Sequence, residues 1–309
     1  MSKTAFIFPG QGSQAVGMLS DIADKYPIIE HTFSEASEAL GYDLWQLVQK
    51  DEEGKLSQTE YTQPALLTAS IALWRLWLQE GGVKPTFLAG HSLGEYSALV
   101  AAGVIELADA VKLVEARGQF MQLAVPEGTG KMAAIIGLDD EKVRDACALA
   151  AQDEVVEAVN YNSPGQVVIA GSVAAVERAM EACKTAGAKR ALPLPVSVPS
   201  HCALMRPAAE KLAHMLESIN INTPVIPVIN NVDVAVESDP KAIKDALIRQ
   251  LYSPVRWTET VQKLKSEDAV ELFECGPGNV LSGLAKRIDR ELNAAPLGTL
   301  DKFEAALSE

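Results

Sequence analysis

The sequence predicts an α/β protein in which a ferredoxin-like small domain is inserted into a larger domain with a mostly parallel sheet. Over the first 127 residues short apolar runs alternate with helix-period segments, as they do where helices cover both faces of a parallel sheet. From residue 128 to 197 the pattern becomes β-α-β-β-α-β, the order of the split ferredoxin-like unit. The first pattern then resumes, so we expect the large domain to comprise residues 1–127 and 198–309.

Two strands and four helices are expected in the first 127 residues. The strands are short apolar runs that stop at turn residues, Thr4–Phe8 before Pro9 and Thr86–Ala89 before Gly90. The expected helices are Tyr26–Leu40, Pro64–Gln79, Tyr96–Ala102 and Leu107–Val125.

The small domain is expected to contain four strands and two helices. The strands are Met132–Ile136, Val155–Tyr161, Gln166–Ala170 and Arg190–Leu194, and the helices are Asp140–Ala151 and Val173–Ala186. In the last segment the expected strands are Val225–Asn230 and Val270–Glu274. The helices there are Ala203–Ile219, Pro240–Leu251, one that follows Gly276-Pro277-Gly278 and ends near Arg290, and a short surface helix at Asp301–Glu309.

Composition excludes several classes of protein. The 309 residues include 27 Lys and Arg against 41 Asp and Glu, a net charge of −14, which argues against nucleic-acid binding and a polybasic membrane anchor. The longest uncharged stretch, Ala158–Val176, contains turn residues, and the N-terminus lacks a signal-peptide pattern, so we expect a cytoplasmic protein without membrane spans. Four cysteines lie far apart without a C-x-x-C pair, so neither disulfides nor a Cys-rich metal site is expected: Cys147, Cys183, Cys202 and Cys275.

The clearest chemical signal is the run Gly90-His91-Ser92-Leu93-Gly94. It matches G-x-S-x-G, the nucleophile elbow, in which a serine sits on a sharp turn between a strand and a helix. The flanking segments read as that strand and that helix. Ser92 is therefore a candidate nucleophile at a helix N-terminus, where backbone N–H groups favour an oxyanion. The alternative is an ordinary turn bounded by glycines.

A serine nucleophile needs a base, and the chain has only four histidines. His31 and His214 lie in helix-period segments, and His91 should point away from its neighbour Ser92 on so tight a turn. By elimination His201, which follows a proline-rich loop, is the candidate base; the alternative is a residue that merely starts a helix. No acidic residue stands out to orient it, although a backbone carbonyl near Gln250 could do so.

An oxyanion hole needs two donors. The Leu93 N–H supplies one by elbow geometry, and the loop around Gln11, between Gly10 and Gly12, could supply the other. The rival interpretation of this loop is a dinucleotide site, because it fits G-x-G-x-x-A. Pro9 interrupts the strand and no strand ends in an acidic residue about twenty positions later, so the oxyanion interpretation is favoured.

Arg117 lies in the middle of the apolar stripe of its helix, where a guanidinium is costly unless it is paired. Spacing leaves two alternatives open: an internal salt bridge, or bidentate binding of a substrate carboxylate. Cys202 could suggest a thiol nucleophile, but it has no elbow.

Seven short motifs occur together and in order along the whole chain. They include Phe-Pro-Gly-Gln-Gly-Ser-Gln at 8–14, Thr-Gln-Pro-Ala at 62–65, Gly-His-Ser-Leu-Gly-Glu-Tyr at 90–96, Glu-Ala-Arg-Gly at 115–118, Asn-Ser-Pro-Gly-Gln at 162–166, Pro-Ser-His at 199–201 and Gly-Pro-Gly at 276–278. The set closely resembles the malonyl-CoA:acyl carrier protein transacylases of bacterial type II fatty acid synthesis.

The resemblance implies an α/β-hydrolase-like large domain and a ping-pong transfer of malonyl through Ser92, with His201 as base. It implies that Gln11 and Leu93 form the oxyanion hole and that Arg117 holds the malonyl carboxylate. Further roles are pocket lining by Gln63 and Asn162 and orientation of the histidine by the Gln250 carbonyl. Malonyl-CoA and an acidic, phosphopantetheinylated acyl carrier protein are the expected partners of a monomer that needs no cofactor and no metal.

Such carriers are acidic, as is this chain, so their encounter calls for a local basic patch. We expect it to comprise Lys189, Arg190, Lys286, Arg287 and Arg290. The remaining alternatives are a serine hydrolase or thioesterase with water as acceptor, a non-enzymatic carrier-docking scaffold, and an oxidoreductase built on the Gly10 loop.

Overall fold

A five-stranded, wholly parallel sheet forms the centre of the large domain in a computed structural model, which describes residues 3–196 and 198–308. Its strand order is β7-β2-β1-β8-β9, so the N-terminal strand lies in the middle. The strands are β1 (Lys3–Phe8), β2 (Phe87–Gly90), β7 (Val228–Ile229), β8 (Ala269–Glu274) and β9 (Asn293–Pro296). Parallel strands end at one edge, and there the turns after β1, β2 and β8 meet.

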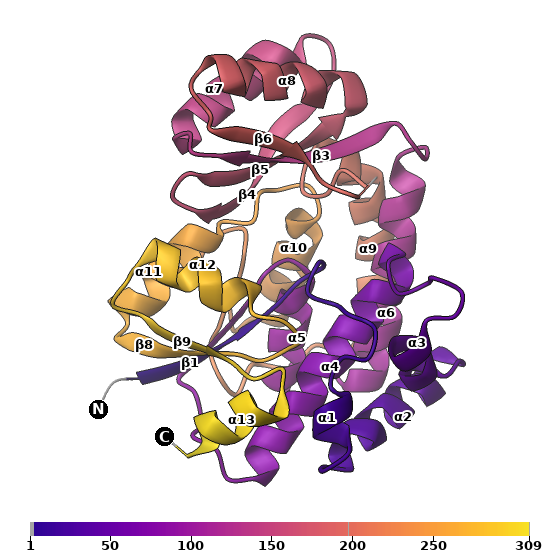
Figure 1. The fold of residues 1–309 in the computed structure, drawn as a ribbon. Helices are drawn as coiled ribbons and strands as arrows, with labels where there is room; N and C mark the ends of the chain where they lie inside the picture. Colours follow the sequence, from indigo (N-terminus) through magenta and orange to yellow (C-terminus); the bar gives the residue numbers. More distant parts are fainter. Residues whose placement is uncertain (1–2, 197, 309) are drawn as a thin grey trace.

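Both faces of this sheet are covered by helices (Figure 1). Side chains alternate along β1, so Phe6 and Phe8 pack into one core, while Ala5 and Ile7 pack into another. The first core lies mainly under α2 (Ile28–Leu40), α4 (Thr59–Gln79), α5 (Leu93–Ala101), α6 (Leu107–Ala124) and α9 (Arg206–Glu217). The second lies under α11 (Trp257–Ser266) and α12 (Val280–Ile288). The remaining helices of the large domain are α1 (Ser20–Ala23), α3 (Leu44–Lys50), the 3₁₀ turn η1 (Ala203–Met205), α10 (Pro240–Gln250) and α13 (Leu300–Leu307).

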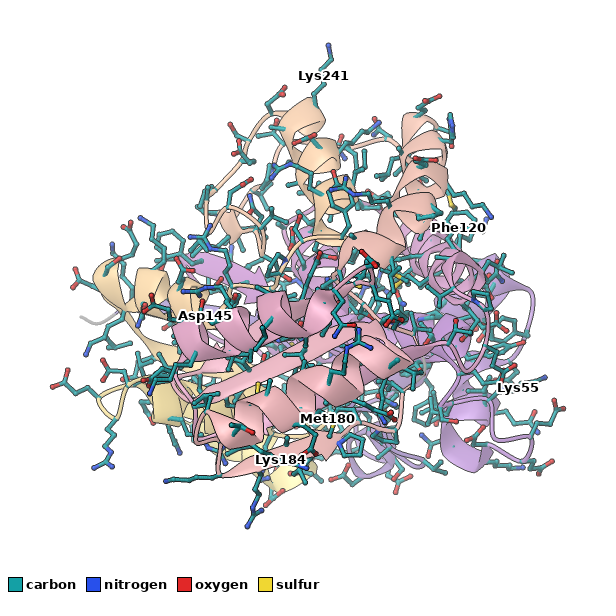
Figure 2. All side chains as sticks on the ribbon, turned by 90° about the horizontal axis from the view of Figure 1, so that it is seen from above. Lys55, Phe120, Asp145, Met180, Lys184 and Lys241 are labelled. Carbon is teal, nitrogen blue, oxygen red and sulfur yellow. The ribbon has the colours of Figure 1, made fainter. Side chains whose placement is uncertain are left out.

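A four-stranded antiparallel sheet of order β4-β5-β3-β6 forms the small domain. Its strands are β3 (Gly130–Ile136), β4 (Val156–Ser163), β5 (Gln166–Ser172) and β6 (Arg190–Pro193). The helices α7 (Asp140–Ala151) and α8 (Val173–Thr185) pack on one face around a separate core. Seen from above they form the outer layer, with Asp145 on α7 and Met180 and Lys184 on α8 (Figure 2).

The two sheets are joined by more than the connecting chain. The Val255 N–H donates to the Val159 carbonyl at 2.8 Å, and the Tyr161 N–H donates to the Val255 carbonyl at 3.0 Å. A short strap from α10 to α11 therefore pairs with β4 of the small domain. On the same side, Arg287 of α12 donates to the Gln166 side chain at 2.7 Å.

The predicted fold class, a parallel α/β sheet with a separate antiparallel sheet, is confirmed. The boundary expected at residue 197 falls outside the described residues, as does Glu309 at the end of the expected last helix. Among the described residues no helix is long and apolar enough to cross a membrane.

Some elements differ from the sequence prediction. Pro64 does not start its helix but lies inside α4, which begins at Thr59. The strand expected at Val225–Asn230 shortens to Val228–Ile229. The helices α3 and α11 and the strand β9 were not predicted, although buried residues of α11 recur at i, i+3, i+4 and i+7 from Trp257 to Leu264.

Candidate active site

The turn between β2 and α5 has the geometry of a nucleophile elbow. Ser92 adopts φ 52° and ψ −111°, a conformation that costs a non-glycine residue about 1–3 kcal/mol. The two glycines of the motif are required by close backbone approach. A Cβ on Gly90 would lie 1.9 Å from the Gly94 carbonyl oxygen, and a Cβ on Gly94 would lie 2.0 Å from the Phe8 carbonyl oxygen. The tight turn thus presents Ser92 at the start of a helix.

Ser92 and His201 form a hydrogen-bonded pair. The Ser92 Oγ lies 2.8 Å from Nε2 of His201, and His201 Nδ1 lies 2.7 Å from the Gln250 carbonyl oxygen. Because a carbonyl oxygen only accepts, Nδ1 carries the proton of the neutral ring, and Nε2 is left to accept from the serine hydroxyl. The arrangement is that of a nucleophile, its base and an orienting group.

The electrostatic environment keeps His201 neutral. Its side chain is buried, and burial together with the nearby Arg117 cation lowers its pKa to about 3, although the bond to Gln250 opposes this. His201 is therefore unprotonated at neutral pH, as a base must be before it accepts a proton.

The two residues expected to supply the oxyanion donors, Gln11 and Leu93, line the same cavity as Ser92. No acceptor among the described residues takes either backbone N–H. The loop of Gln11 is held close to the elbow, since a Cβ on Gly10 would lie 2.5 Å from the His91 carbonyl oxygen. Two free N–H groups at this point can stabilise an oxyanion.

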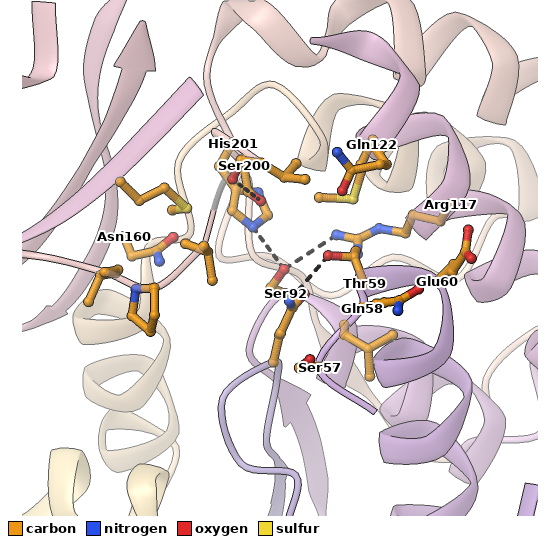
Figure 3. A pocket seen from close by; sticks show the side chains of 18 of the residues that line it. Ser57, Gln58, Thr59, Glu60, Ser92, Arg117, Gln122, Asn160, Ser200 and His201 are labelled. Carbon is orange, nitrogen blue, oxygen red and sulfur yellow. Dashed lines mark hydrogen bonds between the residues drawn. The ribbon is translucent and has the colours of Figure 1, made fainter. Parts of the chain in front are cut away.

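Arg117 is buried and reaches Ser92 from the other side than His201 (Figure 3). Its guanidinium donates to Gln63 Oε1 at 2.8 Å, to Gln250 Oε1 at 2.9 Å and to Ser92 Oγ at 3.3 Å. Within the described residues no carboxylate forms a salt bridge with it. Its Nε–H is buried without a partner. Of the two alternatives left open by the sequence, the internal salt bridge is absent.

The cavity in front of Ser92 has a volume of about 550 Å³ and is lined by both domains. Its polar walls come from the start of α4 and from α6, and the small domain contributes Met132 and Asn160. Figure 3 shows Thr59, Arg117 and His201 around Ser92. Such a volume suits an extended ligand that places one reactive group at the serine.

Gln63 and Asn162 lie behind the cavity wall rather than in it. Gln63 is buried against Arg117, as described, and Asn162 Oδ1 lies 2.8 Å from His91 Nε2. His91 lines the cavity and, as expected from the turn, is engaged away from Ser92. These two amides therefore position residues that line the cavity. Gln63 and Asn162 were expected to line the pocket themselves, and the structure does not place them in its wall.

The thiol alternative meets a physical obstacle. Burial raises the pKa of Cys202 to about 12, and its Sγ donates to the Pro199 carbonyl. A thiolate there is strongly disfavoured. Among the described residues, no group of three or more His, Cys, Asp or Glu side chains could hold a metal ion.

Two buried residues of the site were missed from the sequence. Glu95, three positions after the serine, and Asn231, just after β7, both hydrogen-bond around the elbow. The only available signal was the position of Glu95 on the first turn of the helix, where a carboxylate is expected near free N–H groups.

The chain is similar to known acyl transferases over nearly its whole length. A family model for the acyl transferase domain matches residues 5–278. The malonyl CoA-acyl carrier protein transacylase of Escherichia coli is 63% identical over 307 residues, covering 99% of both chains. That of Bacillus subtilis is 46% identical over 308 residues, covering 99% of this chain and 97% of its own.

Solved structures give the same result. An acyl carrier protein S-malonyltransferase from Vibrio cholerae superposes with a TM-score of 0.97 at 63% identity, over 98% of this chain and 99% of its own. A malonyl-transacylase in complex with its type II PKS acyl-carrier protein gives a TM-score of 0.98 at 59% identity, over 99% of both chains.

Proposed function

The chain belongs to the malonyl CoA-acyl carrier protein transacylases, which makes it an acyltransferase, and we propose that it moves malonyl through a malonyl-Ser92 intermediate. The donor is malonyl-CoA and the acceptor is the phosphopantetheine thiol of an acyl carrier protein. The observation that supports this route most directly is the contact of Ser92 Oγ with both a neutral imidazole and a buried guanidinium.

The first half-reaction transfers malonyl to the enzyme. Ser92 Oγ attacks the thioester carbonyl while its proton passes to Nε2 of His201, and the oxyanion accepts from the N–H groups of Leu93 and Gln11. The C–S bond then breaks, the carbonyl re-forms, and His201 returns the proton to the sulfur of departing CoA. The imidazolium formed between these steps keeps its Nδ1–H on the Gln250 carbonyl.

The second half-reaction reverses these roles. The carrier thiol gives its proton to His201, its sulfur attacks the ester carbonyl, and Ser92 leaves with the proton. Because both halves pass through one covalent intermediate, the kinetics are ping-pong. Neither half needs a metal or a redox cofactor.

Arg117 selects the acyl group in this proposal. Its donors end on neutral amides and a hydroxyl, so a substrate carboxylate would be the first anion that the fork meets directly. The carboxylate would also offset the positive charge beside His201, and so strengthen the base when substrate is bound.

The carrier is proposed to dock at the end of the small sheet where β3 ends, at Ile136. Gln166 and Arg190 flank Ile136 on the two neighbouring strands, and Arg287 reaches Gln166 from α12. Lys189 and Arg190 are exposed at this edge, and Arg287 is brought to it by its contact with Gln166. The proposed docking surface consists of these three residues together with the exposed neighbours of Arg287 in the sequence, Lys286 and Arg290. Basic side chains in an otherwise acidic protein can steer an acidic partner.

The wider setting is also part of the proposal. We propose a monomeric enzyme in the cytoplasm, which agrees with four cysteines that are all buried and free. Disulfides would be expected in an oxidising compartment.

Initial rates over a grid of both substrates test this function. Parallel double-reciprocal lines, with CoA release that depends on the carrier, are expected. Intersecting lines would contradict the covalent route, and carrier-independent CoA release would indicate a hydrolase instead. Charge reversal at Lys286 and Arg287 should raise KM for the carrier alone, whereas equal effects on both substrates would contradict the docking surface.

A further inference from the structure

Three segments that are far apart in the sequence are joined by hydrogen bonds around Ser92. They are the first turn of α5 with Glu95, the residue Asn231 after β7, and Gln250 at the end of α10. The three side chains are buried, with exposed fractions of 2%, 0% and 0%. None of them lines the cavity, so they act on the reaction through other residues.

The Asn231 side chain makes two hydrogen bonds to the strained turn. Its Oδ1 accepts from the Ser92 N–H at 2.8 Å, and its Nδ2 donates to the Gly90 carbonyl at 2.6 Å. The opposite orientation of the amide would place its NH₂ group against the Ser92 N–H and its oxygen against the Gly90 carbonyl oxygen, so neither hydrogen bond could form. The side chain therefore holds Ser92 at its positive φ, a conformation that persists only where its surroundings impose it.

Gln250 meets the other groups of the site. Besides its carbonyl on His201, its Oε1 accepts from Arg117, and its Nε2 donates to the Ser92 carbonyl at 3.0 Å. One residue thus sets the position of the base and contacts both the cation and the backbone of the nucleophile.

Glu95 connects these two amides through a single oxygen. Its Oε2 accepts from the Asn231 N–H and from Gln250 Nε2, both at 2.9 Å. We propose that Glu95 is a positioning residue that locks the elbow of Ser92 to the carbonyl on which His201 is oriented. This inference rests on the proposed role of Ser92 and His201.

The bonds, rather than the charge, carry out this role. Burial raises the pKa of Glu95 to about 7, so near neutral pH the carboxyl is protonated part of the time. Both hydrogen bonds end on Oε2, so a carboxyl group that is protonated on its other oxygen still accepts both of them. A glutamine can present its carbonyl oxygen at the same point. A leucine removes the acceptor, so the buried Asn231 N–H loses its partner and Gln250 Nε2 keeps its bond to the Ser92 carbonyl but loses its bond to Glu95.

The test is the rate constant for modification of Ser92 by phenylmethylsulfonyl fluoride. This reagent needs neither malonyl-CoA nor Arg117, so the result is informative even if the proposed substrate is wrong. We expect Glu95→Leu to slow modification by about 100-fold, the order associated with a displacement of about 1 Å at a reacting group. Glu95→Gln should restore a rate within about threefold of the wild type, by the same reasoning.

Glu274→Leu is the matched control. Glu274 is also a buried carboxylate with two main-chain donors, Leu281 and Ser282, and none of its hydrogen bonds reaches the elbow. It should lower the melting temperature without slowing Ser92 modification. The proposal is overturned if Glu95→Leu reacts at the wild-type rate, if Glu95→Gln is as slow as Glu95→Leu, or if Glu274→Leu slows modification equally.

If Glu95→Leu yields no folded protein, Asn231→Ala tests the same positioning role. It leaves the carboxylate in place and removes the two side-chain bonds to the turn. A fall of about 100-fold in modification rate is expected, on the same displacement argument. A wild-type rate for Asn231→Ala would overturn the proposal.

Discussion

The main-chain carbonyl of Gln250 lies 2.7 Å from Nδ1 of His201, where a serine–histidine–aspartate triad has its carboxylate. A carbonyl fixes the same tautomer as a carboxylate does, but it supplies no negative charge to stabilise an imidazolium. With Arg117 also nearby, the neutral ring is favoured, in agreement with the lowered pKa of His201.

The first prediction concerns the pH dependence of the free enzyme. Because the pKa of His201 is lowered to about 3, the rate of Ser92 modification by phenylmethylsulfonyl fluoride should not fall with a midpoint near 6.5. We expect it to stay within about twofold between pH 7.5 and about pH 5. An acid limb centred near the ordinary histidine value would contradict the assignment of His201 as a buried neutral base.

The second prediction concerns stability against pH. In the unfolded chain the imidazole titrates near 6.5, so between that value and about 3 the unfolded state binds a proton that the folded state does not. His201 therefore removes stability as the pH falls through this window, by up to about 1.4 kcal/mol per unit.

Denaturant unfolding of His201→Gln at several pH values checks this. The free energy of unfolding of the variant should fall less steeply from pH 6.5 to pH 4.5 than that of the wild type. His214→Gln is the matched control, because its imidazole is 82% exposed. Equal slopes for the wild type and His201→Gln would contradict burial of a neutral His201.

The third prediction concerns acyl selectivity. Arg117→Lys keeps the positive charge but loses the planar fork that contacts Gln63 and Gln250. We expect kcat/KM for malonyl-CoA to fall by roughly 100-fold, in the range for breaking a buried charged contact. For acetyl-CoA, which has no carboxylate to bind, the fall should be smaller. An unchanged ratio of malonyl to acetyl transfer would remove Arg117 from substrate recognition.

The sequence located the groups whose signal is local. The elbow motif identified Ser92 and Leu93, and the scarcity of histidines identified His201. The sequence suggested a carbonyl near Gln250 as the group that orients His201, but its assignment to Gln250 itself rested on the family resemblance, because every residue has a carbonyl and spacing cannot single one out. Glu95 and Asn231 escaped notice since their contacts join segments more than 130 residues apart.

The fourth prediction concerns the glycines. Gly90→Ala would bring a Cβ to 1.9 Å from the backbone of Gly94, so the turn must deform, at a cost of about 3 kcal/mol or more. Gly283→Ala is the control, since its Cβ would meet nothing within 4 Å on the helix α12. It should stabilise the protein by about 0.5–1 kcal/mol. Thermal unfolding with opposite signs for the two variants is expected, and a neutral Gly90→Ala would contradict the tight elbow.

The most direct measurement of the central claim is the intact mass of the protein after brief incubation with malonyl-CoA, for the wild type and Ser92→Ala. We expect a malonyl-sized adduct on the wild type alone, which a carrier thiol removes faster than buffer does. An adduct that persists on Ser92→Ala, or carrier malonylation without any adduct on the wild type, would contradict transfer through Ser92.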